Sequence, residues 1–174
     1  MNVRELYVLR HGKSDWGTEG LRDHDRPLKP RGIEAARVMG RLLRDTGSAP
    51  DRVLSSSALR ARHTAELLVE AGGFDCGVDV DERLYDASLE TWLEVVRDTR
   101  DPVVRLVVAG HQPTCSEVIE HLTGAGVDFP TGALARIEVR APSWDRLGPR
   151  ASRLSWLVTP RLLGALVATA ERAR

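Results

Sequence analysis

Short apolar runs alternate with amphipathic stretches along most of the chain. The apolar runs predict strands at residues 6–9, 52–54, 78–80, 103–109, 133–139 and 154–158. Apolar positions spaced by three and four residues predict helices over 31–45, 58–70, 88–97, 113–122 and from Pro160 onward. A serine among residues 55–57 is the expected N-cap of the second helix, and Pro113 is expected to open the fourth. Residues 13–30 are polar, contain two glycines and two prolines, and predict a loop.

This alternation of strands and helices predicts a three-layer α/β/α fold. Connections of this length favour a mostly parallel central sheet with helices on both faces. In such sheets the ligand site lies at the carboxyl ends of the strands. Three strand ends carry reactive side chains: Arg10-His11 after the first strand, Ser55–Arg60 after the second, and His111 after the strand over 103–109. We therefore expect these groups to converge at one edge of the sheet.

Length, charge and apolar content exclude several classes of protein. The chain has 174 residues, which predicts one domain over residues 1–174. It carries 25 basic and 25 acidic residues, so no overall positive field is available to hold nucleic acid or an anionic membrane, and neither is an expected partner. The apolar stretch over 162–170 is too short to span a bilayer. The sequence leaves the oligomeric state open.

Cysteine content and the N-terminal segment bear on the compartment. Cys76 and Cys115 are too few for a disulfide framework or a four-cysteine zinc site. Residues 1–9 contain charged side chains and lack the long apolar core of a signal peptide. A reduced, cytoplasmic protein is the expectation.

Each residue at the three strand ends also has an ordinary structural explanation. His11 or His111 can cap a strand, and Arg60 can be a solvated helix residue. Arg62 lies two residues after Arg60, on roughly the opposite side of the helix, so only one of the two arginines can face a common ligand. Gly12 lets the backbone pass close to a ligand.

Taken together, these residue types indicate phosphoryl transfer. An imidazole can attack phosphorus, and arginine guanidinium groups match the equatorial oxygens of a transferring phosphoryl group. A second histidine can donate a further hydrogen bond. This arrangement would work without a metal ion, because the arginines supply the positive charge that Mg²⁺ supplies in kinases.

Several motifs in this order and spacing are typical of one family. They are Leu9-Arg10-His11-Gly12, Arg26-Pro27-Leu28 with Gly32, Ser57-x-x-Arg60-Ala61-x-x-Thr64, Gly110-His111-x-Pro113, Thr131 before the strand at Ala135, and Trp156 with Pro160. On these motifs the chain resembles the histidine phosphatase superfamily, most closely its compact SixA-type phosphohistidine phosphatase branch. The resemblance implies a phosphoglycerate mutase-like fold without a large lid insertion.

The resemblance also implies residue roles. His11 is expected to be the nucleophile and to form a phosphohistidine intermediate. Substrate phosphate is expected to be bound by Arg10, Gly12, Ser14, Arg60 and His111. No metal ion and no organic cofactor is expected.

The chain departs from the family pattern at two places. Lys13 follows the Arg-His-Gly sequence, where many members have Glu or Gln; it would either favour an anionic substrate or face solvent. The general acid is expected at Glu82, with Asp86 as the alternative and a solvated acidic loop as the competing interpretation. The segment Asp23-His24-Asp25 does not have the spacing of a standard metal site and is interpreted as a salt-bridge cluster.

The predicted function is a metal-independent phosphatase acting on phosphohistidine in proteins. A broad-specificity phosphomonoesterase acting on small phosphorylated metabolites is the alternative with the same chemistry. A mutase and a non-catalytic phosphate-binding module are further alternatives. The chain length argues against the mutase, and the presence of His11, Arg60 and His111 argues against the non-catalytic module.

Overall fold

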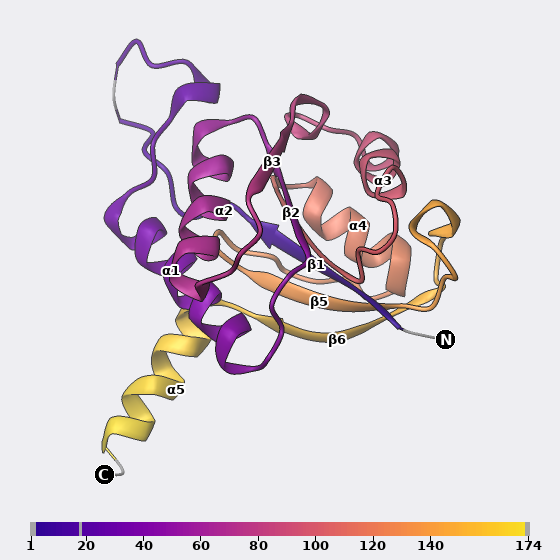
Figure 1. Ribbon diagram of the computed structural model, residues 1–174. Coiled ribbons are helices and arrows are strands. Elements are labelled where there is room, and N and C mark those ends of the chain that lie inside the picture. Colours follow the sequence, from indigo (N-terminus) through magenta and orange to yellow (C-terminus); the bar gives the residue numbers. More distant parts are fainter. Residues whose placement is uncertain (1–2, 18, 173–174) are drawn as a thin grey trace.

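A six-stranded sheet with the strand order β3-β2-β4-β1-β5-β6 forms the centre of the computed structural model, which describes residues 3–17 and 19–172 (Figure 1). Its strands are β1 (Arg4–Arg10), β2 (Arg52–Ser56), β3 (Val78–Asp81), β4 (Arg105–Gly110), β5 (Leu134–Val139) and β6 (Ser152–Val158). The pairs β3/β2, β2/β4 and β4/β1 are parallel, whereas β5 and β6 run antiparallel to their neighbours. β1 and β4 are central strands and are buried on both faces, which explains their continuous apolar sequences.

Helices cover both faces of the sheet (Figure 1). They are α1 (Pro30–Asp45), α2 (Leu59–Gly72), α3 (Leu89–Arg97), α4 (Thr114–Thr123) and α5 (Pro160–Arg172), with 3-10 turns η1 (Asp23–Asp25), η2 (Glu82–Leu84) and η3 (Trp144–Arg146). Successive side chains of β1 point to opposite faces. Leu9 packs in one core cluster with Met39 of α1, and Val8 packs in the other with Trp92 of α3. The sheet therefore separates an α1/α2 layer from an α3/α4 layer.

The expected three-layer architecture with a mostly parallel sheet is confirmed. All the expected strands and helices form, most within a few residues of their expected bounds. The longest connection is residues 11–29, which contains η1 and joins β1 to α1. The single domain expected over 1–174 stays a prediction, and Met1, Asn2, Thr18, Ala173 and Arg174 lie outside the described residues.

The expected serine N-cap of α2 is wrong. Ala58 occupies the N-cap position and makes no side-chain cap hydrogen bond. Ser55 and Ser56 instead belong to β2, where they pair with Ala109 and Asp81. Pairing on both sides extends β2 beyond its apolar residues, so the serines are held in the sheet rather than at the helix start. Pro113 is likewise the N-cap of α4 rather than its first helical residue.

The backbone after β1 packs tightly against the first turn of α1. A Cβ atom placed on Gly12 would lie 2.6 Å from the carbonyl oxygen of Gly32, and one placed on Gly32 would lie 2.4 Å from the carbonyl oxygen of Lys13. Real side chains cannot come so close to backbone atoms, so both positions need glycine. This contact fixes the path of the segment that carries His11.

The last helix, α5, extends away from the layered body (Figure 1). Its N-terminal part lies next to α1, and Leu162 and Leu166 are exposed. Within residues 3–17 and 19–172, no helix combines the length and the apolar character that a bilayer crossing requires.

Candidate active site

The strand ends bring His11 and His111 together. Arg10 and Gly110 are partners in the parallel register of β1 and β4, and each histidine is the next residue along its strand. The two imidazole centroids lie 5.2 Å apart. Arg60, in the first turn of α2, contacts both rings, so the predicted convergence of these residues is observed.

The hydrogen bonds of His11 define which ring nitrogen is available for chemistry. Its Nδ1 lies 2.7 Å from the carbonyl oxygen of Gly12. A carbonyl oxygen can only accept, so Nδ1 carries the proton and Nε2 has the lone pair. This lone pair accepts a hydrogen bond from Nε of Arg60 at 3.3 Å. His11 is only 8 % exposed, and this fixed ring presents a nucleophilic nitrogen next to a guanidinium group.

Burial keeps both histidines neutral. It lowers the pKa of His11 to about 3, helped by the nearby charges of His111, Arg60 and Arg10 and opposed by the hydrogen bond to Gly12. Burial also lowers the pKa of His111 to about 4, with the Arg60 charge as the next cause. At neutral pH the Nε2 lone pair of His11 is therefore not protonated, as nucleophilic attack requires.

These pKa values predict that the protein loses stability as the pH falls from about 6.5 toward 5. In that window histidines of the unfolded chain take up protons, whereas folded His11 and His111, with pKa values of about 3 and 4, do not. The unfolded state then binds more protons, so unfolding becomes easier by up to about 2 kcal/mol for each ring. Urea unfolding at pH 6.5 and pH 5 measures the loss. A His11→Asn, His111→Gln variant should lose less than the wild type, and equal losses would contradict the assignment.

Arg60 is held in place from several sides. Its guanidinium group is 5 % exposed and donates to the backbone carbonyl of Asp23 at 2.6 Å and to the Asp23 carboxylate at 3.0 Å. Thr64, one turn further along α2, donates to the Arg60 carbonyl at 2.6 Å and accepts from the Gly12 backbone N–H at 3.0 Å. One hydroxyl thus ties α2 to the His11 segment, which explains the Arg-Ala-x-x-Thr spacing.

His111 is oriented by Ser56 at the end of β2. Its Nε2 lies 2.8 Å from the Ser56 hydroxyl, and its Nδ1 lies 3.4 Å from Nη2 of Arg60. Because a guanidinium group only donates, Nδ1 accepts and Nε2 donates its proton to Ser56. Tyr85 packs edge-on against the other side of the ring.

Arg10 reaches the site from the last position of β1. Its Nη1 donates to the carbonyl of Phe129 at 2.8 Å. Its Nε is buried and has no hydrogen-bond partner among the described residues. The side chain is therefore anchored at one nitrogen while another donor is unused.

The carboxylate of Asp23 is a site residue that sequence reasoning did not single out. It accepts hydrogen bonds from Arg60, from Nε of Arg26 at 2.9 Å and from the Tyr85 hydroxyl at 3.0 Å. Burial raises its pKa, but these hydrogen bonds and the Arg60 charge outweigh that effect and lower the pKa to about 2. The signal in the sequence was its position three residues before Arg26 in the family motif.

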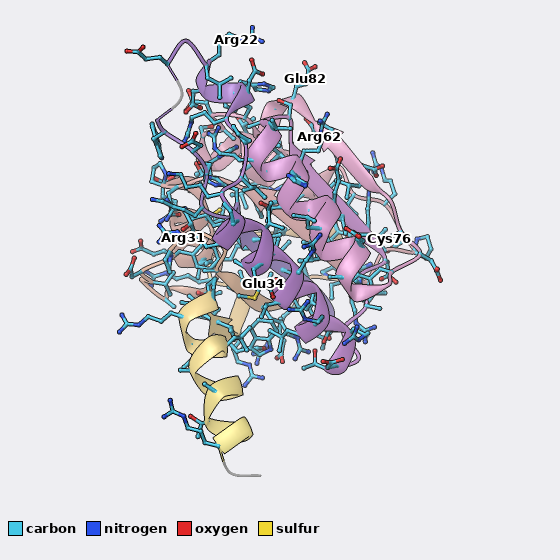
Figure 2. The ribbon with its side chains drawn as sticks, turned by 90° about the vertical axis from the view of Figure 1, so that its left-hand side faces the viewer. Arg22, Arg31, Glu34, Arg62, Cys76 and Glu82 are labelled. Carbon is cyan, nitrogen blue, oxygen red and sulfur yellow. The ribbon has the colours of Figure 1, made fainter. Side chains whose placement is uncertain are left out.

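Of the other expected site residues, only Asp86 lines the cleft beside Arg60. Ser14 is buried, and its hydroxyl accepts a hydrogen bond from Arg26 at 2.8 Å. This bond joins two parts of the connection over residues 11–29. Lys13 is partly buried. Glu82, labelled at the top of Figure 2, is exposed and does not line the cleft beside Arg60, whereas Asp86 does line it.

Arg62 and Cys115 are both held away from the pair of histidines. Arg62 is on the outer side of α2, which faces the viewer in Figure 2, and pairs with Glu66 at 3.5 Å. Cys115 is fully buried, and burial raises the pKa of its thiol to about 12. Within the described parts of the chain, no group of three or more His, Cys, Asp or Glu side chains is arranged to hold a metal ion.

A cleft of about 700 Å³ opens from Arg60 and His111 toward α3 and α4. Its remaining lining residues are Asp23, Leu84, Tyr85, Asp86, Ala87, Ser88, Leu89, Trp92, Gln112, Pro113, Thr114 and Glu117. His11 is not itself among the lining residues, but its ring centroid lies 5.2 Å from that of His111, which is.

Solved structures with the same fold include SixA proteins. A structure provisionally described as the phosphohistidine phosphatase SixA from Nakamurella multipartitia has a TM-score of 0.81 and 28% identity, and the match covers 92% of this chain and 98% of that one. The protein histidine phosphatase SixA complexed with tungstate has a TM-score of 0.79 and 23% identity, over 91% of this chain and 99% of that one. At that identity the second likeness shows the fold alone.

Sequence relatives cover the chain to different extents. An uncharacterized protein of Mycobacterium tuberculosis is 37% identical over 164 residues, which is 88% of this chain and all of the relative. A 2,3-bisphosphoglycerate-dependent phosphoglycerate mutase of Thermobifida fusca is 46% identical over 70 residues, but this is 39% of this chain and 28% of the mutase. A family model matches residues 6–101, more than half of the chain. The chain thus belongs to the histidine phosphatase superfamily, branch 1.

Proposed function

We propose that this chain is a phosphatase that works through a phosphohistidine intermediate on His11. The observation that carries the proposal is the fixed tautomer of His11. Its Nδ1–H is bound to Gly12, and its unprotonated Nε2 faces Arg60 in a buried site. A histidine held in this way has one available lone pair, and that lone pair points to where cationic groups can stabilise a phosphoryl group.

The reaction has two steps. In the first, Nε2 of His11 attacks phosphorus, the N–P bond forms, and the bond from phosphorus to the leaving group breaks. In the second, water attacks the same phosphorus, the N–P bond breaks, and inorganic phosphate leaves. Arg10, Arg60 and His111 stabilise the charge on the phosphoryl oxygens in both steps.

Substrate binding requires Arg60 to change partners. Two of its nitrogens are bound to Asp23 in this structure. The negative charge of a bound phosphate group raises the pKa of His111, so its Nδ1 is more readily protonated and can then donate to the phosphate. Gly12 lets the backbone pass close to the bound phosphate group.

Asp86 is our choice for the acid that protonates an ester leaving group, because it lines the cleft and Glu82 does not. An imidazole leaving group needs such help less than an alkoxide does, since it leaves readily once protonated. A positioned acid contributes about 10²- to 10⁴-fold for a poor leaving group. Hydrolysis of phosphohistidine therefore needs only a weak general acid or none.

Phosphohistidine in a protein is the substrate we favour. Two observations support it: the likeness to a SixA structure over nine-tenths of the chain, and the absence of a long insertion over the cleft among the described residues. The alternative is a broad-specificity phosphomonoesterase for small metabolites, which the same cleft could serve. The likeness to a mutase covers less than a third of that protein, so it gives weaker support for a mutase function.

A substrate comparison tests this function. Purified protein is given a phosphohistidine protein, a phosphoserine peptide and a panel of sugar phosphates, each with and without EDTA, and kcat/KM is compared. We expect the highest value for phosphohistidine and no effect of EDTA. A preference for sugar phosphates would reverse the substrate assignment, and inhibition by EDTA would contradict the metal-free mechanism.

A further inference from the structure

The charged side chains that line the cleft are distributed unevenly. Among the described residues that line the cleft, Arg60 is cationic and lies beside the neutral His111, whereas Asp23, Asp86 and Glu117 are acidic. Asp86 follows η2, and Glu117 lies in the first turn of α4, so the two carboxylates come from separate elements that border the cleft. Carboxylates thus face the part of the cleft where a leaving group would lie.

The three carboxylates differ in how far their charge is compensated. Asp23 is paired with Arg26 and Arg60. Neither Asp86 nor Glu117 has an ion-pair partner within residues 3–17 and 19–172. The leaving-group part of the cleft therefore carries uncompensated negative charge.

The inner wall of the same part of the cleft is apolar. It includes Leu84, Leu89 and Trp92. Trp92 is 1 % exposed, and its buried Nε1 would lie 3.4 Å from a Cβ placed on Gly110, so it faces the end of β4. An apolar wall suits the face of a flat ring.

We propose that this part of the cleft is a leaving-group subsite that favours neutral or cationic aromatic leaving groups and disfavours anionic ones. The inference rests on the proposed phosphatase function and specifies its substrate class. Asp86 and Glu117 attract a cationic group and repel a second carboxylate or phosphate. The imidazole of phosphohistidine is neutral or cationic near pH 7 and fits the subsite, whereas a phosphoglycerate carries its own carboxylate and does not.

Three phenyl phosphates that differ only at the para position test the inference. One carries an aminomethyl group, one a methyl group and one a carboxylate. The test variant is Asp86→Asn, Glu117→Gln, which removes both charges with little change of shape. Asp86 has a φ of 52°, and asparagine tolerates this left-handed conformation as well as aspartate does. A loss of acid catalysis at Asp86 would affect all three compounds, so the ratio of kcat/KM between the cationic and anionic compounds isolates the charge effect.

Each exposed charge contributes little on its own, but the double variant removes two charges that act on both the cationic and the anionic compound. We therefore expect the ratio to fall about tenfold. Glu117→Gln alone should give part of the change, and added salt should reduce the wild-type ratio. The control variant Glu70→Gln, Glu120→Gln removes the same number of charges from exposed positions outside the cleft lining and should leave the ratio unchanged.

The possible failures are distinguishable. If all three compounds are hydrolysed but the ratio is the same in wild type and double variant, the subsite inference is wrong and the phosphatase proposal stands. An equal shift in the control variant would also overturn the inference, because the effect would then come from overall charge. If the wild type hydrolyses none of the three, the subsite inference is overturned, because the cleft then accepts no aromatic leaving group. The phosphatase proposal is decided separately, by activity on a phosphohistidine protein.

Discussion

Replacing His11 with asparagine is expected to lower turnover on the order of 10⁵-fold or more, to the background of the assay. Asparagine can still donate to the Gly12 carbonyl, as Nδ1 of the histidine does at 2.7 Å, but it has no nucleophilic nitrogen in place of Nε2. The thiol of Cys115 does not replace it, since it is buried and protonated. Steady-state kcat with the preferred substrate measures the effect.

The control for this variant is His63→Asn on α2. His63 is partly buried and does not line the cleft, so its replacement removes an imidazole without touching the site. It should retain turnover within a few fold. Turnover that survives in the His11 variant, with folding confirmed by circular dichroism, would refute the covalent route through His11.

The second large effect is expected for Arg60→Ala. The side chain contacts the imidazoles of His11 and His111, and on our proposal its loss should raise the barrier by about 3 kcal/mol, as for removal of one oxyanion donor. This corresponds to a loss of kcat/KM of roughly 100-fold or more. Arg60→Lys should recover only part of the loss, because lysine keeps the charge without the planar pair of donors.

Arg62→Ala is the matched control for Arg60. Arg62 lies two residues away on the same helix and is exposed, and within the described part of the chain its side chain makes only a surface ion pair with Glu66. Its removal should change stability and kcat/KM by less than about 1 kcal/mol. If the two alanine variants lose the same activity, or if Arg60→Ala loses none, Arg60 has no role in binding the phosphoryl group.

The sequence allowed the site to be located because two rules combine. Continuous apolar runs identify buried parallel strands, and ligand sites lie at the carboxyl ends of such strands. Arg10 and His11 follow one run, and His111 follows another. The parallel register that pairs Arg10 with Gly110 then places the two histidines side by side.

The strand order and the antiparallel edge were not predictable in the same way. Apolar runs show that a strand is buried but not which strand is its neighbour, so the order β3-β2-β4-β1-β5-β6 required the structure. The serine N-cap was wrong for a related reason. Pairing of Ser55 and Ser56 with neighbouring strands, which a local pattern does not report, holds them in β2.

The acidic residues of the site were the hardest to assign from sequence. Asp23 was one of several charged residues in a polar loop, and its role depends on contacts with Arg60, 37 residues away, and with Tyr85. Glu82 and Asp86 are four residues apart and equally plausible by position, but only Asp86 reaches the cleft lining. Side-chain direction in a loop has no sequence period, so these assignments needed coordinates.

The most direct test of a phosphorylated His11 is to trap the intermediate. The wild-type protein is mixed with ³²P-labelled substrate, quenched within the first turnover in alkali, and analysed by mass spectrometry of its peptides. Our account predicts one phosphoryl group on the peptide that contains His11, stable to alkali and labile to acid, and no labelling of the His11→Asn variant. A phosphoryl group on a different residue, or equal labelling of the variant, would contradict it.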